Sequence, residues 1–421
     1  MADSAPPLEP RPLSPLTWWS LAVAAGLVFG PLWLSFLYPP RSHILDFFQD
    51  WSSARCFFQG LSIYTPLEES AERFLGLDID PARTHLGRQS THPPASVLLV
   101  LPLAVLGYPE AFLIWNLLSL GCGVASVYLI WREIGPPWPG AGLGLALAVA
   151  LAASPLLEQV HHAQINLVLL LLTVAGWRAM RRQEWGWAGA LLGSAAAVKL
   201  MPAYLFLVPL VRRQWMTLLA GGAAFFLWTG VAYVLFGPDA FRKYQAFMLP
   251  HLELYRSDWL NASFFGFFSR LFDVGPAGAR AEPILTLPLV AKVLTWLGAI
   301  AVTLLAGGSA WRAKDSAQLD AAWGLTLTAM LLASPFTWEH YLVLLVPALW
   351  LAWQRARTLG DAVVLGLITV GLLLHPAYFW SWTVPPGFGQ AVAQPWQSLT
   401  VVAVKFYALV GFCAWQWRRR V

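Results

Sequence analysis

Two ionisable residues, Asp46 and Lys199, carry most of the chemical information in this chain. Asp46 follows the first long hydrophobic segment, and Lys199 lies inside the apolar stretch AAAVKLMPAYLFLVPL. An ammonium group inside hydrocarbon is costly, so we expect Lys199 to have an anionic partner or to face a wet cavity. A carboxylate beside a membrane together with a buried cation would suit chemistry on a lipid-linked phosphate.

Other polar residues gather on the same predicted side of the membrane, in loops or at the outer ends of apolar segments. The turns on the opposite side contain no comparable cluster of histidines and carboxylates. This asymmetry predicts an active cavity at the outer leaflet. Besides Asp46, its members are Asp50, His92, His161, His162, Gln164, Asn166, Asn261, Glu339, His340 and His375.

Asp46 has two interpretations. It could cap a helix by accepting backbone N–H bonds, or it could act as a general base that removes a proton from an attacking hydroxyl. Asp50 lies one helical turn further on, and two carboxylates close together would repel, so that one pKa would be raised. Asp50 is more simply interpreted as a solvated surface residue paired with Arg41 or Arg55.

Lys199 and His340 are candidates to bind a phosphate. Lys199 could instead extend to the interface or pair with a buried carboxylate. We favour an electrostatic clamp on phosphate, because ionisable residues inside a membrane usually serve function. His340 stands at the head of a helix that starts at the outer face, where it could cap the helix or donate to a phosphate oxygen. Arg55 or Arg256 would add positive charge.

No metal or cofactor is expected. His161 and His162 are adjacent, so their side chains do not face one another on a helix. The chain has no HExxH motif and no carboxylate cluster typical of a metal site, and the spacing of its three cysteines is not that of metal ligands. The glycines form no phosphate loop, and no nucleotide-binding soluble module is present. The physical alternative is a lipid-linked donor whose tail lies in an apolar groove between helices.

The composition indicates an integral membrane protein. Of the 421 residues, 58% are hydrophobic and only 12% are charged, whereas soluble globular proteins carry about a quarter charged residues. The 24 tryptophans favour the membrane–water boundary. The net charge of +5 does not indicate nucleic-acid binding, because the basic residues sit in short turns between apolar segments. We therefore expect an all-α polytopic membrane protein.

The distribution of arginine and lysine predicts its orientation. Basic residues mark the turns at 181–182, 212–213, 312–314 and 355–357 and the C-terminus, and they are absent from 157–163, 334–339 and 375–397. The positive-inside rule places the basic turns in the cytoplasm. We expect about 12 crossings, several of them shorter than the usual ~20 residues, with both termini cytoplasmic. The protein would lie in the inner (plasma) membrane, with its site on the periplasmic or extracellular side.

The chain is expected to form one integral membrane domain, residues 16–421. The Pro-rich residues 1–15 are predicted to be a disordered cytoplasmic tail. Two longer outer loops, 38–93 and 238–283, are the segments where binding and catalysis tend to be found.

The first outer loop is predicted to contain an amphipathic helix that starts near Asp46 and ends near Gly60. We expect it to lie on the outer membrane surface with its aromatic face in the lipid boundary. The residues of that face, at helical spacing, are Phe47, Phe48, Trp51, Ala54 and Phe58.

Two other segments are predicted to be interrupted. The stretch 94–131 is too long for one span and breaks near Gly107, so its first half, 94–107, is expected to be re-entrant or interfacial. The stretch 187–211 is expected to split into two short helices at Lys199 and Pro202.

These residues resemble glycosyltransferase family 87, the polyprenol-phosphate-mannose-dependent mannosyltransferases of the GT-C superfamily. The matching segments follow the family's order along most of the chain, although the charged stretch 68–90 has no counterpart. They are Asp46-Phe47 with Trp51, Ala54-Arg55 and Gly60 to Tyr64; His92-Pro93-Pro94; Gln164-Ile165-Asn166; Lys199 with Pro202; Asn261, Ser263 and Arg270; and Ser334-Pro335 with Trp338 to Tyr341.

The resemblance implies a GT-C-like bundle whose first outer loop carries the catalytic Asp46. It implies inverting transfer of a sugar, usually mannose, from a polyprenyl-phosphate donor to a hydroxyl of a glycolipid or glycan acceptor, in contact with membrane lipids. Lys199, His340 and Arg55 would bind the donor phosphate. The secondary candidates are Asp50, His92, Gln164, Asn166, Asn261, Arg256, Trp338 and Glu339.

Two other classes of protein are alternatives. A transporter or lipid flippase would predict inverted repeats with paired broken helices and charge along the whole path, whereas charge here is concentrated at one face. A lipid-linked glycan polymerase or ligase would require a large outer loop with basic pairs. Arg242-Lys243 and Arg256 in the second outer loop keep that alternative open.

Overall fold

The structure, a computed structural model, describes residues 15–38, 44–78, 90–136, 143–273, 281–375 and 392–419. These ranges are helical and contain no strand beyond one isolated bridge between Ala281 and Ala393. The predicted all-α class is therefore confirmed. The expected disordered tail lies outside the described residues, apart from Pro15, with which the first helix begins.

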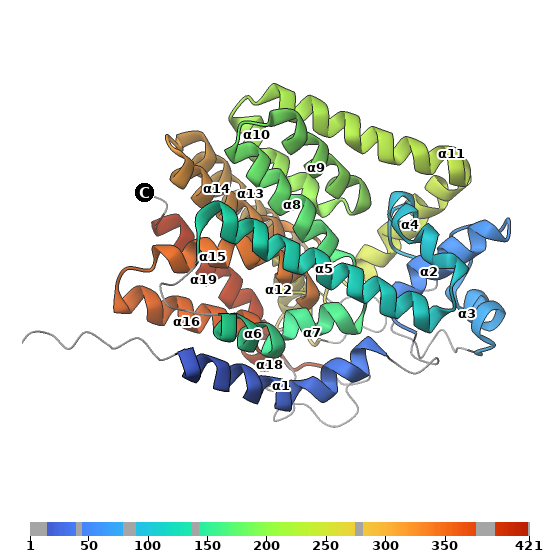
Figure 1. Cartoon of the computed structure of the whole chain (residues 1–421), viewed down its shortest axis with the longest axis horizontal. Helices are drawn as coiled ribbons and strands as arrows, with labels where there is room; N and C mark the ends of the chain where they lie inside the picture. Colours follow the sequence, from blue (N-terminus) through green and yellow to red (C-terminus); the bar gives the residue numbers. More distant parts are fainter. Residues whose placement is uncertain are drawn as a thin grey trace, which may run out of the picture.

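The N-terminal third holds the first long helix, the helices of the first outer loop and a second long helix (Figure 1). These elements are α1 (Pro15–Leu37), α2 (Asp46–Phe58), α3 (Leu67–Leu75), α4 (Pro94–Val100), the 3-10 helix η1 (Leu101–Val105) and α5 (Tyr108–Ile134).

The middle of the chain contains mostly short helices followed by a very long one. They are α6 (Leu143–Ala152), α7 (Ser154–His161), α8 (Asn166–Arg181), α9 (Trp185–Val198), η2 (Met201–Phe206), α10 (Leu207–Val211) and α11 (Trp215–Leu254). The last of these, α11, is broken at Gly237, whose φ of 75° is not helical.

The C-terminal part completes the bundle. Its elements are α12 (Phe264–Phe272), α13 (Pro288–Arg312), α14 (Ser316–Ala333), η3 (Glu339–Leu345), α15 (Val346–Arg355), α16 (Leu359–Leu373), α18 (Pro395–Leu399), η4 (Val401–Ala403) and α19 (Val404–Arg418).

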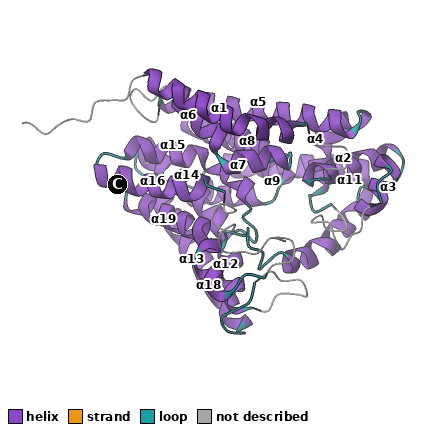
Figure 2. Ribbon diagram, turned by 90° about the horizontal axis from the view of Figure 1, so that it is seen from below, coloured by secondary structure: helices purple, strands orange, loops and turns teal. Residues whose placement is uncertain are grey.

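The helices pack as a chain of neighbours around one large hydrophobic core cluster and smaller ones beside it. Helix α8 contacts α5 on one side and α9 on the other, and α9 in turn packs against α11. Helix α1 lies along one edge of the molecule with α6 beside it, while α12 and α18 form the narrow opposite end (Figure 2). The largest core cluster reaches from α2 through α8 and α14 to α19.

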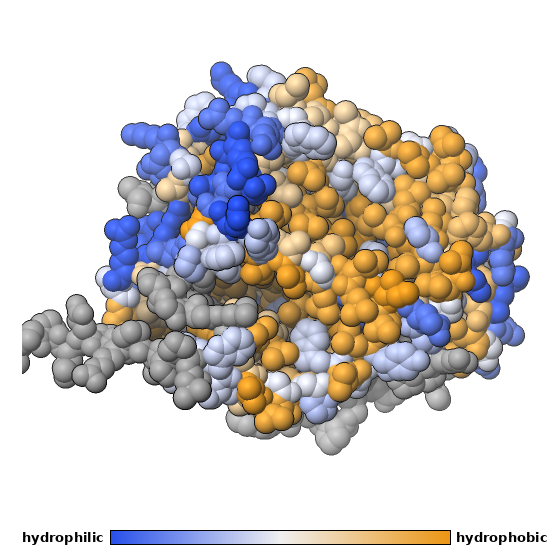
Figure 3. Space-filling view, in the orientation of Figure 1, coloured by the Kyte–Doolittle hydropathy of each residue, from blue (hydrophilic) through white to orange (hydrophobic). Residues whose placement is uncertain are grey.

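Much of the outer surface is apolar. Large hydrophobic side chains on α5 and α11, such as Leu118, Val124, Phe226 and Val234, are more than half exposed. Figure 3 shows this apolar surface between hydrophilic regions at the two sides of the view. A surface of this kind is what lipid-facing helices require, so the chain is a multi-pass membrane protein.

Five described helical segments are long and apolar enough to cross a membrane, and four shorter apolar segments have 10–17 residues. The expected number of about 12 crossings stays a prediction. The five long segments are Thr17–Leu37, Tyr108–Ile134, Trp215–Met248, Pro288–Arg312 and Pro395–Arg418, and the shorter ones are Pro94–Val105, Trp185–Val198, Met201–Val211 and Leu359–Leu373.

The predicted helix of the first outer loop is present, but its predicted environment was wrong. It runs over Asp46–Phe58 and is followed by Gly60 with φ 71°. Phe47, Phe48 and Trp51 do not face lipid, since each is at most 1% exposed. Their rings pack against α5 at Tyr108, and α2 also contacts α4 and η1. The short helices of 94–105 therefore cover the aromatic face, of which only Phe58 is largely exposed.

Lys199 ends α9 as predicted. Its backbone is extended, with φ −149° and ψ 125°, and the chain then continues as η2 with Pro202 in its first turn. Helix α9 lies so close to α11 that a Cβ on Gly189 or Gly193 would collide with the backbone of α11. Small residues four apart commonly allow such close helix contacts in membranes. The contact with α11 therefore helps to set the position of Lys199, which follows the last residue of α9.

Candidate active site

Asp46 is the first residue of α2 and faces the turn between α7 and α8. Its Oδ2 accepts a hydrogen bond from Gln164 Nε2 at 2.6 Å and lies 3.3 Å from His162 Nδ1. Its Oδ1 has a long contact of 3.5 Å from Gln49 Nε2. Leu45, not Asp46, occupies the N-cap position, and no side chain caps this helix. The capping interpretation was therefore wrong, and the carboxylate, 24% exposed, is directed at side chains.

The charges around Asp46 keep it ionised. Burial opposes ionisation, but the His162 imidazolium and the Gln164 amide hold the pKa of the Asp46 carboxyl well below its usual range. Burial alone would lower the pKa of His162, yet the carboxylates of Asp46 and Glu158 raise it to about 10. Both residues lie outside the helical segments that are long and apolar enough to cross a membrane. At neutral pH the pair is a carboxylate beside an imidazolium.

Lys199 is buried and held by uncharged groups. Its Nζ donates to Asn166 Oδ1 at 3.2 Å and lies 3.9 Å from the centre of the Tyr341 ring. Asn166 is fixed in turn, because its Nδ2 donates to Gln159 Oε1 at 3.0 Å. Among the described residues, no carboxylate lies within ion-pair distance of Lys199, although Asp46 acts on it electrostatically from further away. Of the two environments expected for Lys199, an anionic partner or a wet cavity, the described residues do not provide the first.

His340 joins the cluster from η3. Its ring centre lies 5.6 Å from that of His162 and 4.9 Å from that of Tyr341. Its Nε2 is buried and has no hydrogen-bond partner among the described residues. A buried polar nitrogen is normally satisfied, so this one is suited to a ligand. The structure therefore brings Asp46, Lys199 and His340 to one place from three separate elements.

Asp50 and His92 form a second buried pair. His92 Nδ1 lies 2.9 Å from Asp50 Oδ1, and Ser96 donates to the same carboxylate at 3.3 Å. Asp50 is only 4% exposed, so its interpretation as a solvated residue paired with an arginine was wrong. Tyr64 supports the backbone here by donating to the His92 carbonyl. This pair connects the first outer loop to the start of α4.

Glu339 lies at the start of η3 but is buried away from the outer surface. It pairs with Lys405 at 3.0 Å and accepts from Ser154. His375 lies 3.8 Å from the same carboxylate and 3.3 Å from Glu158. A row of alternating charges therefore extends from the cluster toward α19.

Four other predicted site residues lie outside the cluster. Arg55 is nine residues from Asp46, about 13 Å along the helix, and its guanidinium donates to the Ala104 carbonyl and covers the Trp51 ring. Arg256 pairs with Asp273 and Glu253. The Asn261 side chain donates to the carbonyls of Arg256 and Pro335 and accepts from the backbone N–H of Thr337, so it holds two loops together. Trp338 packs on the ring of Tyr255.

Sequence reasoning missed Glu158 and Lys405 and left the role of His162 undecided. Glu158 and His162 are four residues apart, so they share a helix face, and that spacing was a usable signal. Lys405 lies in an apolar segment, where the argument applied to Lys199 holds equally. Tyr341 lies in a segment that carries the family resemblance, but its contact with an ammonium could not be predicted, because that contact is created only by packing.

The cluster and the basic turns lie at opposite ends of α8. Asn166 starts this helix beside Lys199, and Arg181 ends it, about 24 Å away for 16 helical residues. At the basic end, Arg178 and Arg181 bind Glu133. This separation agrees with the sequence, which predicts the polar cluster and the basic turns on opposite sides of the membrane.

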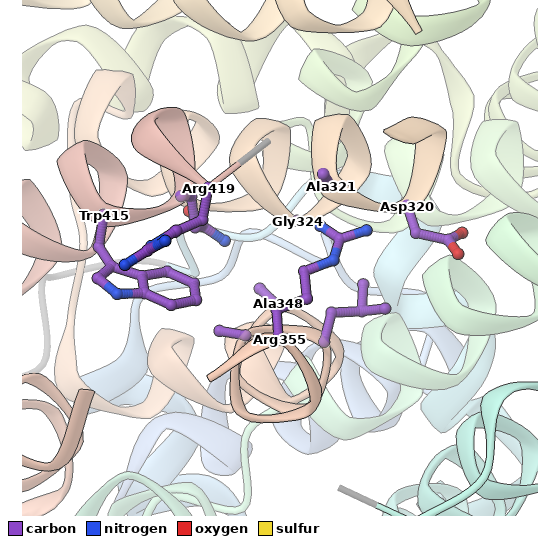
Figure 4. A pocket seen from close by; sticks show the side chains of 10 residues that line it. Asp320, Ala321, Gly324, Ala348, Arg355, Trp415 and Arg419 are labelled. Atoms are coloured by element: carbon purple, nitrogen blue, oxygen red, sulfur yellow. The ribbon is translucent and has the colours of Figure 1, made fainter. Parts of the chain in front are cut away.

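A small hollow at the basic end, between α14, α15 and α19, is distinct from the cluster around Asp46. Arg355 extends into it, with Trp415 and Arg419 on another side (Figure 4). Asp320, the one carboxylate among the lining residues, is bound by Arg181. We assign this hollow no part in the chemistry at Asp46.

Fold and site together define a class: a multi-pass, all-helical membrane enzyme with its polar cluster at one end of the bundle. The profile of glycosyltransferase family 87 matches residues 91–335, more than half of the chain. The chain belongs to glycosyltransferase family 87. The matched range contains Gln164 and Lys199, whereas Asp46 and His340 lie outside it.

The chain is similar to curated mycobacterial enzymes. It is 28% identical over 77% of its length, and 76% of the relative, to the polyprenol-phosphate-mannose-dependent alpha-(1-2)-phosphatidylinositol pentamannoside mannosyltransferase of Mycolicibacterium smegmatis. It is 26% identical over 93% of its length, and 88% of the relative, to the polyprenol-phosphate-mannose-dependent alpha-(1-2)-phosphatidylinositol mannoside mannosyltransferase of Mycobacterium tuberculosis. A crystal structure of ArnT from Cupriavidus metallidurans bound to undecaprenyl phosphate aligns over 97% of this chain and 78% of that chain, with a TM-score of 0.43 and 16% identity.

Proposed function

We propose that this glycosyltransferase moves mannose from a polyprenyl-phosphate donor to an acceptor hydroxyl, with inversion, and that Asp46 is the general base. Donor class and sugar are those in the names of its mannosyltransferase relatives. The observation that carries the assignment of the site is that Asp46 and Lys199 converge on neighbouring rings: His162 lies between Asp46 and His340, and Tyr341 beside His340 contacts the Lys199 ammonium. That ammonium has no ion-pair partner among the described residues.

The reaction needs one displacement and one proton transfer. The acceptor oxygen attacks the anomeric carbon as its proton passes to Asp46, and the bond between that carbon and the phosphate oxygen breaks. The polyprenyl phosphate leaves with the bonding electrons. Phosphate is a good leaving group, so no strong acid is needed. The site has to supply a positioned base and charge stabilisation for the departing phosphate.

Lys199 and His340 are proposed to hold the donor phosphate. The neutral partners of Lys199 orient its ammonium without neutralising it, so the attraction to an anion is retained. His340 adds a buried nitrogen that can donate to a phosphate oxygen. Arg55 is not proposed for this role, because its guanidinium is engaged by the Ala104 carbonyl.

The acceptor is proposed to be a glycolipid, as in the phosphatidylinositol mannosides named in the relatives. A lipid-linked donor and a lipid-linked acceptor would reach the cluster from the same leaflet. The basic turns then lie in the cytoplasm, and the site faces the periplasm or the cell exterior from the plasma membrane.

Transfer of radiolabelled mannose by the purified protein tests this function. We expect a product from polyprenyl-phosphate-mannose and a phosphatidylinositol mannoside, with the anomeric configuration opposite to that of the donor. Asp46→Asn should lower the rate by about 10²- to 10⁴-fold and leave the thermal unfolding temperature near that of the wild type. Glu133→Gln, the same chemical change at the basic end, is the matched control. Wild-type transfer by Asp46→Asn would remove Asp46 from its role.

A further inference from the structure

The row of charges behind Asp46 begins with an imidazole placed between two carboxylates. His162 Nδ1 lies 3.3 Å from Asp46 Oδ2, and His162 Nε2 lies 3.2 Å from Glu158 Oε2. Glu158 is held on its other oxygen by His375, which also faces Glu339. Both contacts of His162 are at ion-pair distance, and its Nδ1 lacks the geometry of a hydrogen bond to Asp46. The two flanking carboxylates favour the imidazolium form, so the contact with Asp46 is one between opposite charges.

We propose that His162, supported by Glu158, is a positioning residue that orients the Asp46 carboxylate and keeps it ionised when an anionic donor enters the site. The inference rests on the proposed role of Asp46 as general base. It deepens that role, because it names the groups that make a partly buried carboxylate available to the acceptor.

The contacts of Asp46 divide its two oxygens between the protein and the acceptor. Oδ2 is engaged by both Gln164 and His162, whereas Oδ1 has only the long contact of 3.5 Å from Gln49. Oδ1 is therefore the oxygen that receives the acceptor proton. In this step the acceptor O–H bond breaks and the proton moves to Oδ1, while His162 keeps both of its protons.

The imidazolium is needed because the donor is anionic. A phosphate beside Lys199 adds negative charge near Asp46, and a like charge raises the pKa of a carboxyl. In the free protein the contact with His162 holds the pKa of Asp46 below its usual range against the effect of burial. Without His162, burial and the donor phosphate would act together, and Asp46 would take up a proton at a higher pH.

Several titratable groups face Asp46 and His162, and their effects must be separated from that of His162. The wild type and the His162 variants share these groups, so a ratio of rates measured at each pH largely cancels their titration. They are Glu158 on α7, His161 beside His162, Lys199 at the end of α9, Tyr108 at the start of α5, and His340 and Tyr341 on η3.

The test is the ratio of kcat for His162→Gln to that of the wild type between pH 7 and pH 5, measured by mannose transfer from polyprenyl-phosphate-mannose to a phosphatidylinositol mannoside, because kcat reports the groups of the enzyme with its substrates bound. We expect the ratio to fall by at least about threefold as the pH is lowered, because without the imidazolium both burial and the donor phosphate raise the pKa of the Asp46 carboxyl above its usual value. A ratio that is constant with pH, whatever its value, overturns the inference.

Two further variants separate charge from packing. His162→Lys retains a cation between the carboxylates, so its ratio should stay nearly constant with pH. Glu158→Gln weakens the support of His162 and should give a smaller fall in the same direction. Glu133→Gln at the basic end should give none. If His162→Lys falls as steeply as His162→Gln, the positive charge is not the cause and the inference fails.

Failure of the inference and failure of the proposed function give different results. Full activity of Asp46→Asn would reject the general base itself. An inactive Asp46→Asn together with a pH-independent ratio for His162→Gln would leave the base in place and reject only the role of His162.

Discussion

The ammonium of Lys199 lies 3.9 Å from the centre of the Tyr341 ring. The ring quadrupole attracts a cation without cancelling its charge, and the only polar contact found for this ammonium among the described residues is the neutral Asn166 amide. An ion pair with a carboxylate would have satisfied the ammonium within the protein. The arrangement observed leaves its charge directed at an incoming anion.

Replacing Lys199 by Met should weaken the reaction but not the fold. We expect kcat/KM to fall by about 10²- to 10³-fold, the usual effect of removing one preorganised charge-stabilising group. Thermal stability should be unchanged or higher, because a costly buried charge is removed. The measurements are transfer kinetics and thermal unfolding in detergent. Lys314→Met, at an exposed lysine near the basic end, is the control, and equal kinetics of the two variants would argue against the clamp.

The sequence was sufficient for local features whose cause is local. The helix over Asp46–Phe58 follows from aromatic residues at helical spacing, and the break at Lys199 follows from the polar residue with Pro202 behind it. The environment of Asp50 could not be predicted in this way. Its partner His92 is 42 residues away, and the pairing depends on how α4 folds back over α2.

In the candidate site, too, the identity of residues could be predicted from the sequence, whereas contacts between distant residues could not. The choice of Asp46, Lys199 and His340 came from residue type and membrane side, and the structure places the three together. Arg55 was placed wrongly, because helical spacing alone gives no indication that the Ala104 carbonyl engages it. Lys405 was overlooked although it obeys the same rule as Lys199, since no motif drew attention to it.

The buried pair Glu339–Lys405 should be important for stability. Glu339→Gln or Lys405→Met leaves one charge buried without its partner, which typically costs about 3–5 kcal/mol. The double variant removes both charges and should recover much of the loss. The free energy of unfolding in mixed micelles measures this, with Glu69→Gln in the exposed pair Arg73–Glu69 as the control, expected to change it by less than about 1 kcal/mol. Additive single losses would show that the two residues are not coupled.

The contact between α9 and α11 should be sensitive to one methyl group. Gly193→Ala places a Cβ against the carbonyl of Gly221, so α9 has to move away and carry Lys199 with it. We expect a loss of about 1–3 kcal/mol in the free energy of unfolding, together with lower transfer activity. Gly186→Ala on the same helix meets nothing within 4 Å and should be neutral or slightly stabilising. Identical results for the two variants would mean that α9 does not depend on this contact to place Lys199.

The raised pKa of His162 also predicts how stability depends on pH. Because the folded-state pKa of about 10 lies above the ordinary histidine value of 6.5, protonated His162 stabilises the fold fully below about pH 6.5. That contribution is lost as the pH rises through the folded-state value. The difference in unfolding temperature between wild type and His162→Gln should therefore be largest near pH 6.5 and shrink steadily toward pH 10. Thermal unfolding at intervals across this range measures it, and a difference that stays constant would mean that His162 does not titrate between the two carboxylates.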